Sequence, residues 1–406
     1  MCSIFQINTT LNQGAIGRIA EQIGLLAEER GWKVITAHGA RYIQPSCLES
    51  YQICSSLDEK RHFLNSLLFD GQGLSCSNAT RTLTKRIEEI NPTIVHLHNI
   101  HGYYINYKIL FEFLNRKKIP VVWTLHDCWA FTGHCAYFDM IRCEKWQIGC
   151  SACPQTKEYP KAIIDKSKRN WKLKKELFSN HPNLTLVPVS NWLADKCKLS
   201  FLNNNASIIP IHNGIDINVF KEDEEGGKEV KRKYGIRGKM VIAIANGFGK
   251  RKGLEDILSL RKLLAKDIAI VLVGVSKKEK KQAGNDFVTV EHTENISELI
   301  ALYSAADVFI NPTHEDNYPT TNLEAMACGT PVITYRTGGS PEAVDVKTGI
   351  VVDDGDIQGL HDAILIVLNS SKKYTKDYCR KRAEKCFDKN KCFGAYMKLY
   401  EEVLSK

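Results

Sequence analysis

Residues 308–334 read VFINPTHEDNYPTTNLEAMACGTPVIT, and this stretch decides the fold class. The apolar runs Val308–Asn311 and Pro331–Thr334 predict buried strands, and the run Asn322–Cys328 between them predicts a helix. A strand, a helix and a strand in this order form the repeating unit of a parallel sheet. The polar loop after the first strand therefore lies at a carboxyl strand end, where α/β folds bind ligands.

The same alternation of short apolar runs and longer amphipathic runs extends from this stretch towards both ends of the chain. Further strands are predicted at Ser3–Ile7, Trp32–Ala37, Thr93–Leu97, Pro120–Leu125, Leu184–Pro188, Met240–Ala245, Ile268–Val273 and Val288–Val290. Helices are predicted at Gly14–Arg30, Leu254–Ala265 and Lys391–Ser405. This order predicts an α/β protein with two Rossmann-like, doubly wound domains that face each other across a cleft.

The length of the chain, 406 residues, suffices for two domains that each bury a core. The stretch Phe201–Asn218 is rich in Asn and Pro and marks the connection between them. We predict an N-terminal domain over residues 1–210 and a C-terminal domain over residues 211–388. Residues 389–406 are predicted to form a helix that packs back on the N-terminal domain.

The composition is that of a globular protein with an anionic partner. Apolar residues make up 43% of the chain, charged residues 25%, and the net charge is +9. This charge suits a nucleotide, a nucleic acid, a lipid diphosphate or a membrane face without choosing among them. The opening residues MCSIFQINTT do not resemble a signal peptide, and no run of about 18 apolar residues occurs. We therefore expect a cytoplasmic protein.

Two acidic residues mark the loop and the helix of the opening stretch. Asp316 precedes the predicted helix and Glu324 lies within it. Loop amides and a helix N-terminus together make a site for a diphosphate, and a carboxylate can accept two sugar hydroxyls at once. The pattern fits equally well a helix whose acidic residues are stabilised by the helix dipole. Spacing alone does not decide between these interpretations.

A basic turn follows the strand predicted at Met240–Ala245. It reads GFGKRKGL over residues 247–254 and contains Gly247, Arg251 and Lys252. Clustered cations at a strand-to-helix turn suit a diphosphate, because the two charges are opposite. A solvated basic loop is an equal interpretation of the same residues.

Two features of the N-terminal half also follow predicted strands. Gly14 and Gly17 lie in the first strand-to-helix turn, but their spacing is not that of the dinucleotide-binding fingerprint. His126 follows a later strand, and His98 and His101 follow the strand before it. A single histidine is more often structural, whereas several at strand ends suggest a role in positioning a substrate.

The stretch from Asp316 to Glu342 resembles the donor-site signature of glycosyltransferase family 4, whose members are retaining enzymes with the GT-B fold. Glu324 stands at the second acidic position of that signature, and Gly338-Gly339 precedes Pro341-Glu342 as in the family. Asp316 replaces the usual first Glu, and Asn317-Tyr318-Pro319 replaces the usual Gly-Phe-Gly. This variant is similar to the branch used in extracellular and capsular polysaccharide synthesis.

The resemblance implies a retaining transfer of a sugar from a nucleotide-sugar donor to a saccharide or lipid-linked acceptor, with no cofactor required for catalysis. It implies catalytic roles for Lys252, Arg251, Asp316 and His126. It further implies a donor-binding set made of Gly14, Gly17, Gly247, Lys252, Asp316, Asn317, Thr320, Thr321 and Glu324.

A lipid-linked acceptor would bring the protein to the cytoplasmic face of the inner membrane. The lysine-rich stretch Lys157–Lys175 predicts a basic helix, with Ile164, Trp171 and Phe178 at heptad spacing. Such a helix can lie on an anionic membrane or pack one face on its own domain, and the second interpretation is favoured.

Four of the fourteen cysteines lie close together in the sequence, namely Cys135, Cys143, Cys150 and Cys153. One Cys-x-x-Cys pair with two nearby thiols fits a structural zinc site, although the spacing is not that of a standard zinc finger. Loop cysteines that pack as small apolar groups are the alternative.

Two other functions are compatible with parts of the sequence. A phosphorylase or a sugar-nucleotide epimerase uses a related two-domain fold, although we identify no cofactor lysine of a phosphorylase. A zinc-containing nucleic-acid-binding protein would fit the charge and the cysteines. Its basic residues would be expected to interleave with aromatic ones, whereas here they are dispersed, so we expect no nucleic-acid partner.

Overall fold

The computed structural model describes residues 2–370 and 373–405 of the chain. The described residues divide into two compact units. One, which we call the N-terminal unit, runs to His212 and takes up the chain again from Cys392. The other, the C-terminal unit, spans Asn213–Lys391. The boundaries predicted from the sequence are residues 210 and 388.

Within the described residues, the N-terminal unit contains a seven-stranded parallel sheet in the order β3-β2-β1-β4-β5-β6-β7. The strands are β1 (Ser3–Asn8), β2 (Lys33–His38), β3 (Glu49–Gln52), β4 (Ile94–Leu97), β5 (Val121–Leu125), β6 (Leu184–Pro188) and β7 (Ser207–Ile208). The helices are α1 (Gly14–Glu29), α2 (Ser56–Phe69), α3 (Ser77–Ile90), α4 (Tyr107–Lys117), α5 (Lys145–Ile148), α6 (Ser167–Ser179), α7 (Asn191–Leu199) and α15 (Lys389–Leu404). The strand order reverses between β1 and β4, which makes this pair the switch point of a doubly wound sheet.

The first strand shows why these strands are continuous apolar runs. Every residue of β1 after Ser3 is buried, because layers of helix cover both faces of a parallel sheet. Ile4 of β1 pairs with Val34 of β2 on one side and with Ile94 of β4 on the other. The far end of the chain completes the same core, because α15 contributes Phe393, Tyr396, Met397, Leu399 and Tyr400 to it.

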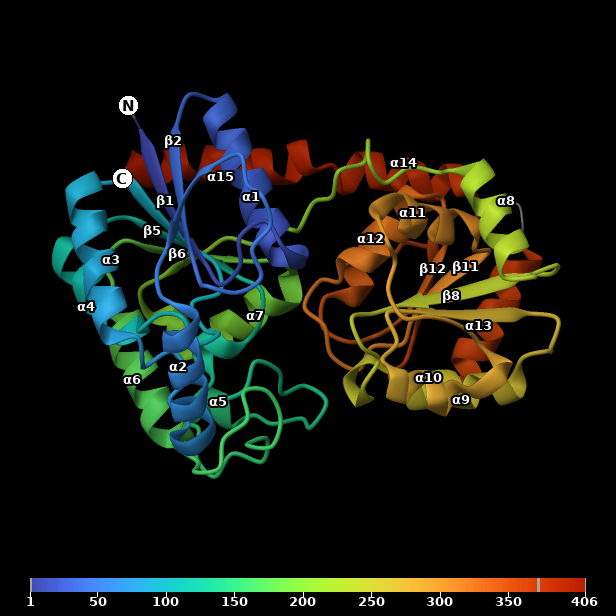
Figure 1. The fold of residues 1–406 in the computed structure, drawn as a ribbon, viewed down its shortest axis with the longest axis horizontal. Coiled ribbons are helices and arrows are strands. Elements are labelled where there is room, and N and C mark those ends of the chain that lie inside the picture. Colours follow the sequence, from blue (N-terminus) through green and yellow to red (C-terminus); the bar gives the residue numbers. More distant parts are fainter. Residues whose placement is uncertain (1, 371–372, 406) are drawn as a thin grey trace. The chain divides into compact units, whose positions relative to one another are not determined.

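Within the described residues, the C-terminal unit contains a six-stranded parallel sheet in the order β10-β9-β8-β11-β12-β13. The strands are β8 (Met240–Ile244), β9 (Ala269–Val273), β10 (Val288–Val290), β11 (Val308–Asn311), β12 (Val332–Tyr335) and β13 (Gly349–Val352). The helices are α8 (Glu224–Lys233), α9 (Leu254–Leu263), α10 (Lys277–Ala283), α11 (Ile296–Ala305), α12 (Thr320–Ala327), α13 (Ile357–Asn369) and α14 (Lys376–Cys386). The order here reverses between β8 and β11 (Figure 1).

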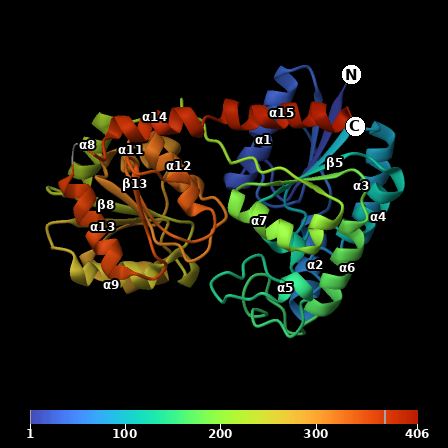
Figure 2. The ribbon, with the colours of Figure 1, turned by 180° about the vertical axis from the view of Figure 1, so that it is seen from behind.

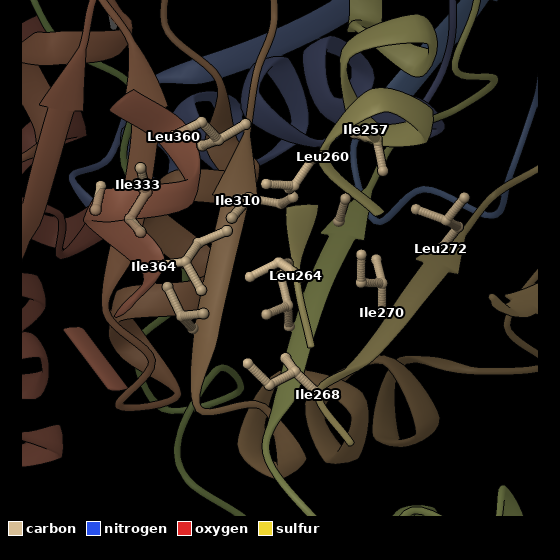
Figure 3. Close-up of a cluster of buried hydrophobic side chains, with 14 of the residues drawn as sticks. Ile257, Leu260, Leu264, Ile268, Ile270, Leu272, Ile310, Ile333, Leu360 and Ile364 are labelled. Atoms are coloured by element: carbon tan, nitrogen blue, oxygen red, sulfur yellow. The ribbon is translucent and has the colours of Figure 1, made fainter. Parts of the chain in front are cut away.

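Helices cover both faces of this second sheet. Figures 1 and 2 show α9 on one side of the strands, with α11 and α12 on the other. Apolar residues of α9 recur at helical spacing and face the sheet. Figure 3 shows the resulting cluster, which includes Ile257, Leu260, Leu264, Ile270, Leu272, Ile310, Ile333, Leu360 and Ile364. A buried apolar layer therefore holds the strand ends in fixed positions.

The lysine-rich stretch Lys157–Lys175 is a loop followed by a helix, rather than the one helix that the sequence predicts. All of Lys157–Lys175 is described, and the helix α6 begins only at Ser167. Ile164 lies in the preceding loop and is 43% exposed, whereas Trp171 and Phe178 are buried. The helical part therefore packs one face into its own unit. Among the described residues, we find no helix that is both long and apolar enough to cross a membrane.

Candidate active site

Two loops meet at the switch point of the C-terminal sheet. β8 and β11 pair directly, with Val241 opposite Val308, so their carboxyl ends open on the same edge. The loop after β8 continues into the short turn Lys250–Lys252. The loop after β11 runs to the start of α12 at Thr320. Residues from these two loops make up the candidate site.

Lys252 and Asp316 join the two loops through an ion pair between Nζ and Oδ2. Their side chains are 20% and 19% exposed, so water only partly screens the pair. Burial raises the pKa of Asp316, but the charges of Lys252 and Arg251 outweigh burial and hold the pKa below its usual range. The site therefore contains a carboxylate and a cation side by side at neutral pH.

Arg251 holds the same two loops together through the backbone. Its Nη1 donates to the Glu315 carbonyl at 2.7 Å, and its own carbonyl accepts from the His314 N–H at 2.9 Å. The Thr313 hydroxyl donates to the same Arg251 carbonyl at 3.3 Å. Arg251 thus positions the loop that carries Asp316, a role that its place in the sequence did not predict.

Two glycines permit this close approach of the loops. Gly253 has a φ of +71°, and a Cβ there would lie 2.0 Å from the Pro312 carbonyl oxygen. Gly338 has a φ of +51°, and a Cβ there would lie 1.7 Å from the Asp316 carbonyl oxygen. Any other residue would push the loops apart as well as strain the backbone. Gly253 of the basic turn and Gly338 of the Gly-Gly pair therefore have a direct structural reason.

Helix α12 presents its N-terminus at the end of the second loop. Pro319 is the N-cap, and no side chain of the described residues caps the helix there. The first-turn N–H groups and the helix dipole make this end attractive to an anion. Thr320 and Thr321 are half-buried at this end, and Asn317 is buried just before it.

Glu324 lies one turn further along α12 and is buried. The hydroxyl of Tyr303, from α11, donates to its Oε2 at 3.0 Å and fixes the carboxylate. On the same helix, Asn322 Oδ1 accepts from Asn311 Nδ2 of β11 at 2.8 Å. The helix is therefore tied to the strand before it, and Glu324 has a defined orientation that sequence spacing did not show.

An acidic side chain binds backbone N–H groups of the basic turn after β8. Glu279 accepts through one oxygen from the backbone N–H groups of Phe248 at 2.8 Å and Gly249 at 2.9 Å. The same residue completes the capping box of α10 with Ser276. Gly247, with a φ of +80°, has no other described atom near its missing Cβ. The space beside the Cα atom of Gly247 is thus open. The backbone N–H groups of the next two residues, in contrast, already bind Glu279.

The N-terminal unit places His126 in a stack of histidines rather than alone. His98 Nδ1 lies 3.2 Å from His126 Nε2, and the two rings stack with centroids 5.5 Å apart. Burial lowers the pKa of His126 to about 4, with a smaller opposing effect from Asp127. The His126 imidazole is therefore neutral at pH 7. Asp127 itself pairs with His101 Nε2 at 2.8 Å.

The histidine stack is supported by the C-terminal helix. Tyr400 of α15 hydrogen-bonds His96 Nδ1 at 2.8 Å, and Thr124 hydrogen-bonds His96 Nε2 at 2.9 Å. Tyr396, one turn earlier in α15, hydrogen-bonds the Thr124 hydroxyl at 3.0 Å. Both tyrosines are buried, and they lie within the helix that the sequence predicts at Lys391–Ser405.

Gly14 and Gly17 lie in the N-terminal unit, at the start of α1. Gly14 has a φ of +70°, and a Cβ on Gly17 would lie 2.6 Å from the Thr10 hydroxyl oxygen. The positive φ of Gly14 and the close contact at Gly17 explain the two glycines by local geometry. Their role in donor binding stays a prediction.

The four cysteines of the predicted cluster line a common cavity. All four are free thiols. Among the described residues, no three His, Cys, Asp or Glu side chains already have the arrangement of a metal site. The cluster of thiols is therefore present, and metal binding stays a prediction.

Comparisons with known proteins match both halves of the chain to glycosyltransferases. A family model described as glycosyltransferase family 4 matches residues 57–219, and one described as glycosyl transferases group 1 matches residues 228–385. WcaC of Escherichia coli, which carries the name of a colanic acid biosynthesis glycosyl transferase, is 28% identical over 68% of this chain and 67% of its own. CapM of Staphylococcus aureus, named a capsular polysaccharide biosynthesis glycosyltransferase, is 24% identical over 54% of this chain. The chain spans about two thirds of WcaC and 59% of CapM.

Solved structures show the same fold at low identity. The sucrose-phosphate synthase of Thermosynechococcus elongatus covers 100% of both chains with a TM-score of 0.73 and 16% identity. HepE of Anabaena, solved with UDP-glucose, covers 100% of both chains with a TM-score of 0.67 and 15% identity. The predicted GT-B fold is confirmed by these neighbours and by the two doubly wound sheets. The two family models lie in different halves of the chain and both describe glycosyltransferases, so the chain is a glycosyltransferase with a family 4 domain over residues 57–219 and a group 1 domain over residues 228–385.

Proposed function

We propose that this protein is a retaining glycosyltransferase that moves a hexosyl group from a nucleotide sugar to a saccharide or lipid-linked acceptor in polysaccharide synthesis. The observation that carries the proposal is the Lys252–Asp316 pair beside the N-terminus of α12. It offers a cation for a diphosphate and a carboxylate for sugar hydroxyls at adjacent points. The names of WcaC and CapM and the UDP-glucose in HepE support the same reading.

In the proposed reaction, the bond between the anomeric carbon and the diphosphate breaks, and negative charge grows on the leaving diphosphate. The acceptor hydroxyl oxygen bonds to the anomeric carbon, and its proton passes to the leaving diphosphate. Lys252 turns from Asp316 to this diphosphate, and the first-turn amides at Thr320 and Thr321 bind its oxygens. Arg251 adds positive charge while it holds the loop. Charges that are in place before the bond breaks stabilise the transition state more than the ground state.

The remaining donor contacts follow from the same geometry. Asp316, released from Lys252, accepts hydrogen bonds from sugar hydroxyls, and Asn317 lies next to it in the loop. Glu324, oriented by Tyr303, accepts from the ribose hydroxyls. The open space at Gly247 leaves room for the phosphates beside the basic turn.

His126 is proposed to position the acceptor. A neutral imidazole can accept or donate one hydrogen bond to a sugar hydroxyl without attracting a counter-ion. Its neutrality follows from burial. The proposal for His126 is independent of the donor residues, because it belongs to the N-terminal unit.

Donor binding is tested with a panel of UDP-, GDP- and ADP-sugars in a thermal-shift assay. Binding at 100 times the Kd is expected to stabilise the protein by about 2.7 kcal/mol. Glu324→Gln is expected to weaken the effect of the best nucleotide at least about 10-fold in Kd, since it removes a charged acceptor. Glu229→Gln, at an exposed position on α8, is the matched control. A panel without any stabilising nucleotide would contradict the proposal.

Retention is tested on the product. With an α-linked donor, NMR of the new glycosidic bond is expected to show an α-linkage. A β-linkage would show inversion, and a dependence on inorganic phosphate would point to a phosphorylase instead.

A lipid-linked acceptor is supported by an exposed surface of the N-terminal unit, which we call the α2 face. Five apolar side chains of α2, each 42–55% exposed, form part of it: Leu57, Phe63, Leu64, Leu68 and Phe69. Ile163 is 70% exposed, and its N–H donates to the Leu67 carbonyl at 2.7 Å, which joins its loop to α2. Exposed cations in the same two segments are Lys60, Arg61, Lys161, Lys166 and Lys168. Apolar groups flanked by cations suit an anionic membrane surface.

Membrane binding is tested by sedimentation with phosphatidylglycerol vesicles at low salt. The protein is expected to sediment with them and to be released by salt, because cations contribute to binding. Leu68→Glu is expected to weaken binding several-fold, whereas Leu199→Glu, at an exposed leucine of α7, is not. Equal sedimentation of both variants would exclude the α2 face.

A further inference from the structure

The segment over residues 132–166 is long and has little regular structure. All of it is described, and the four-residue helix α5 is its one regular element. Loops of this length inside a compact domain generally need a function or a source of order beyond their own backbone. The segment nevertheless has buried side chains, including Phe138 and Trp146, whose rings stack with centroids 4.9 Å apart.

The four cysteines of this segment converge on one small cavity. Its volume is about 20 Å³, and its walls include Cys135, Cys143, Cys150 and Cys153. A space of about 10–15 Å³ on this measure holds a single water molecule. The cavity therefore has room for one ion and not for an organic ligand.

The sulfur atoms are already engaged in polar contacts. The thiols of Cys135 and Cys153 are hydrogen-bonded to each other. Cys150 Sγ accepts from the Gly133 N–H at 3.2 Å, and Cys153 accepts from the Gln155 N–H. Backbone N–H groups aimed at sulfur stabilise a thiolate, and such outer contacts commonly surround metal-bound thiolates.

A buried histidine and a buried lysine lie near the cysteines, and one ring nitrogen of the histidine has no hydrogen-bond partner among the described residues. His134 lines the cavity, and its Nε2 has no hydrogen-bond partner among the described residues, while Nδ1 pairs with Asp70 at 2.6 Å. Lys174 is buried and donates to the carbonyls of Trp129 at 2.6 Å and Thr132 at 3.1 Å. Lys174 also lies 3.3 Å from the centroid of the Trp129 ring, and the Asp70 carboxylate and the cysteine sulfur atoms are near enough to act on its charge. Further negative charge at the sulfur atoms would therefore stabilise this buried ammonium.

We propose that Cys135, Cys143, Cys150 and Cys153 bind one zinc ion in a closed structural site. Four thiolates in tetrahedral geometry are a preferred zinc environment, and soft sulfur ligands select zinc over magnesium or calcium. Binding releases four thiol protons to solvent and leaves a site of net charge −2. That charge compensates Lys174. The present arrangement of these side chains is not that of a metal site among the described residues, so binding requires the cysteine side chains to rotate about their Cα–Cβ bonds.

The first experiment measures zinc in the full-length protein purified under reducing conditions. Native mass spectrometry and elemental analysis are expected to find one zinc ion per chain. Cys135→Ser and Cys150→Ser are each expected to lower the zinc content at least about 10-fold, in line with the loss of one of four ligands. Cys197→Ser, at a buried cysteine of α7, is the matched control and is expected to keep the zinc. A zinc-free wild-type protein, or full zinc in Cys150→Ser, would overturn the proposal.

A second measurement uses the wild-type protein, so it tests the proposal even if the cysteine variants fail to fold. A mercurial reagent added to the wild-type protein is expected to release the zinc into a chromogenic chelator, because it displaces thiolate-bound metal. Replacement by cobalt is expected to give strong thiolate-to-metal absorption. Release of zinc by a histidine-modifying reagent but not by the mercurial would contradict thiolate binding.

A third comparison assigns the fourth ligand. Cys143→Ser is expected to lose the zinc, and His134→Gln is expected to keep it. The opposite result would replace Cys143 by His134 and overturn the four-cysteine assignment. A disulfide between Cys135 and Cys153 in the reduced preparation would overturn metal binding altogether. Nucleotide binding in the thermal-shift assay reports on the C-terminal unit, so failure of the zinc site and failure of the proposed function are distinguishable.

Discussion

Two buried histidines lie in neighbouring parts of the N-terminal sheet, His96 in β4 at the switch point and His126 directly after β5. Burial lowers the pKa of His96 to about 3 and that of His126 to about 4. At the switch point of the C-terminal sheet, Lys252 and Asp316 form an ion pair that stays charged. The first six strands of the N-terminal sheet follow the same order as the six strands of the C-terminal sheet, so topology alone does not account for the difference. The loops that follow the strands decide whether a site suits neutral hydroxyls or a charged diphosphate.

The largest expected effect is at the charged site. Lys252→Ala is expected to lower kcat/KM about 100- to 1000-fold, because it removes a cation aimed at the leaving group. Lys250→Ala, at an exposed lysine of the same turn, is the matched control. Steady-state kinetics with the best donor measures both, and circular dichroism checks that they fold. Full activity in Lys252→Ala would remove the distinction between the two switch points.

A glycine tests how closely the charged site depends on backbone contact. Gly338→Ala is expected to destabilise the C-terminal unit by about 3 kcal/mol, since it combines a left-handed φ with a clash against the Asp316 carbonyl. Gly355→Ala shares a positive φ of +76° but meets no described atom within 4 Å, so it should cost about 1 kcal/mol. Urea denaturation followed by circular dichroism measures the difference. Equal effects would show that backbone strain alone matters.

The pH dependence of stability separates the two sites. A buried histidine whose pKa is lowered takes up a proton more readily when unfolded, so its stabilising effect is lost as pH falls from 6.5 towards 4. The N-terminal unit should lose on the order of 2 kcal/mol per such histidine between pH 7 and 5. Asp316, whose pKa is lowered from 3.8, contributes a loss only at lower pH.

Tryptophan fluorescence measures this effect, because all six tryptophans lie between residues 32 and 192 in the N-terminal unit. His126→Gln should flatten the dependence between pH 7 and 5. An unchanged slope in that variant would show that other groups titrate in this range.

The smallest effect on stability is expected when the hydrogen bond from α15 to the histidine stack is removed. Tyr400→Phe is expected to cost about 1–2 kcal/mol, since it leaves His96 Nδ1 without its partner in a buried place. Tyr42→Phe, at a residue that is 64% exposed, should cost almost nothing. Fluorescence-detected urea denaturation compares them, and equal stabilities would count against the α15 contacts.

The fold was predictable where apolar periodicity is strong. The strands over Leu184–Pro188, Val288–Val290 and Val308–Asn311 were predicted with their observed bounds, and the other predicted strands differ by one residue at one or both ends. The strand β13 was not predicted. β3 was not predicted, because an exposed edge strand of four residues has no apolar run. β7 was not predicted either, since its two residues lie in the stretch identified as a connection.

The candidate site was predictable only in part. The sequence places Lys252 and Asp316 at strand ends, but their ion pair depends on β8 and β11 being neighbours. Glu279 contacts the basic turn, and Tyr303 contacts Glu324. In both cases the two partners belong to different elements that are separated in the sequence. Lys174 lies in a lysine-rich stretch that suggests a solvated surface, yet tertiary packing buries it. A contact partner that belongs to another element leaves no pattern in the sequence around the residue it contacts.

The helix α15 has a consequence for synthesis on the ribosome. Its tyrosines complete the core around His96, although they emerge only after the whole C-terminal unit has been translated. The first unit to leave the ribosome is therefore the last to acquire its full core. Until then, the apolar surface that α15 covers on β-strands and α1 stays exposed to other nascent chains and to chaperones.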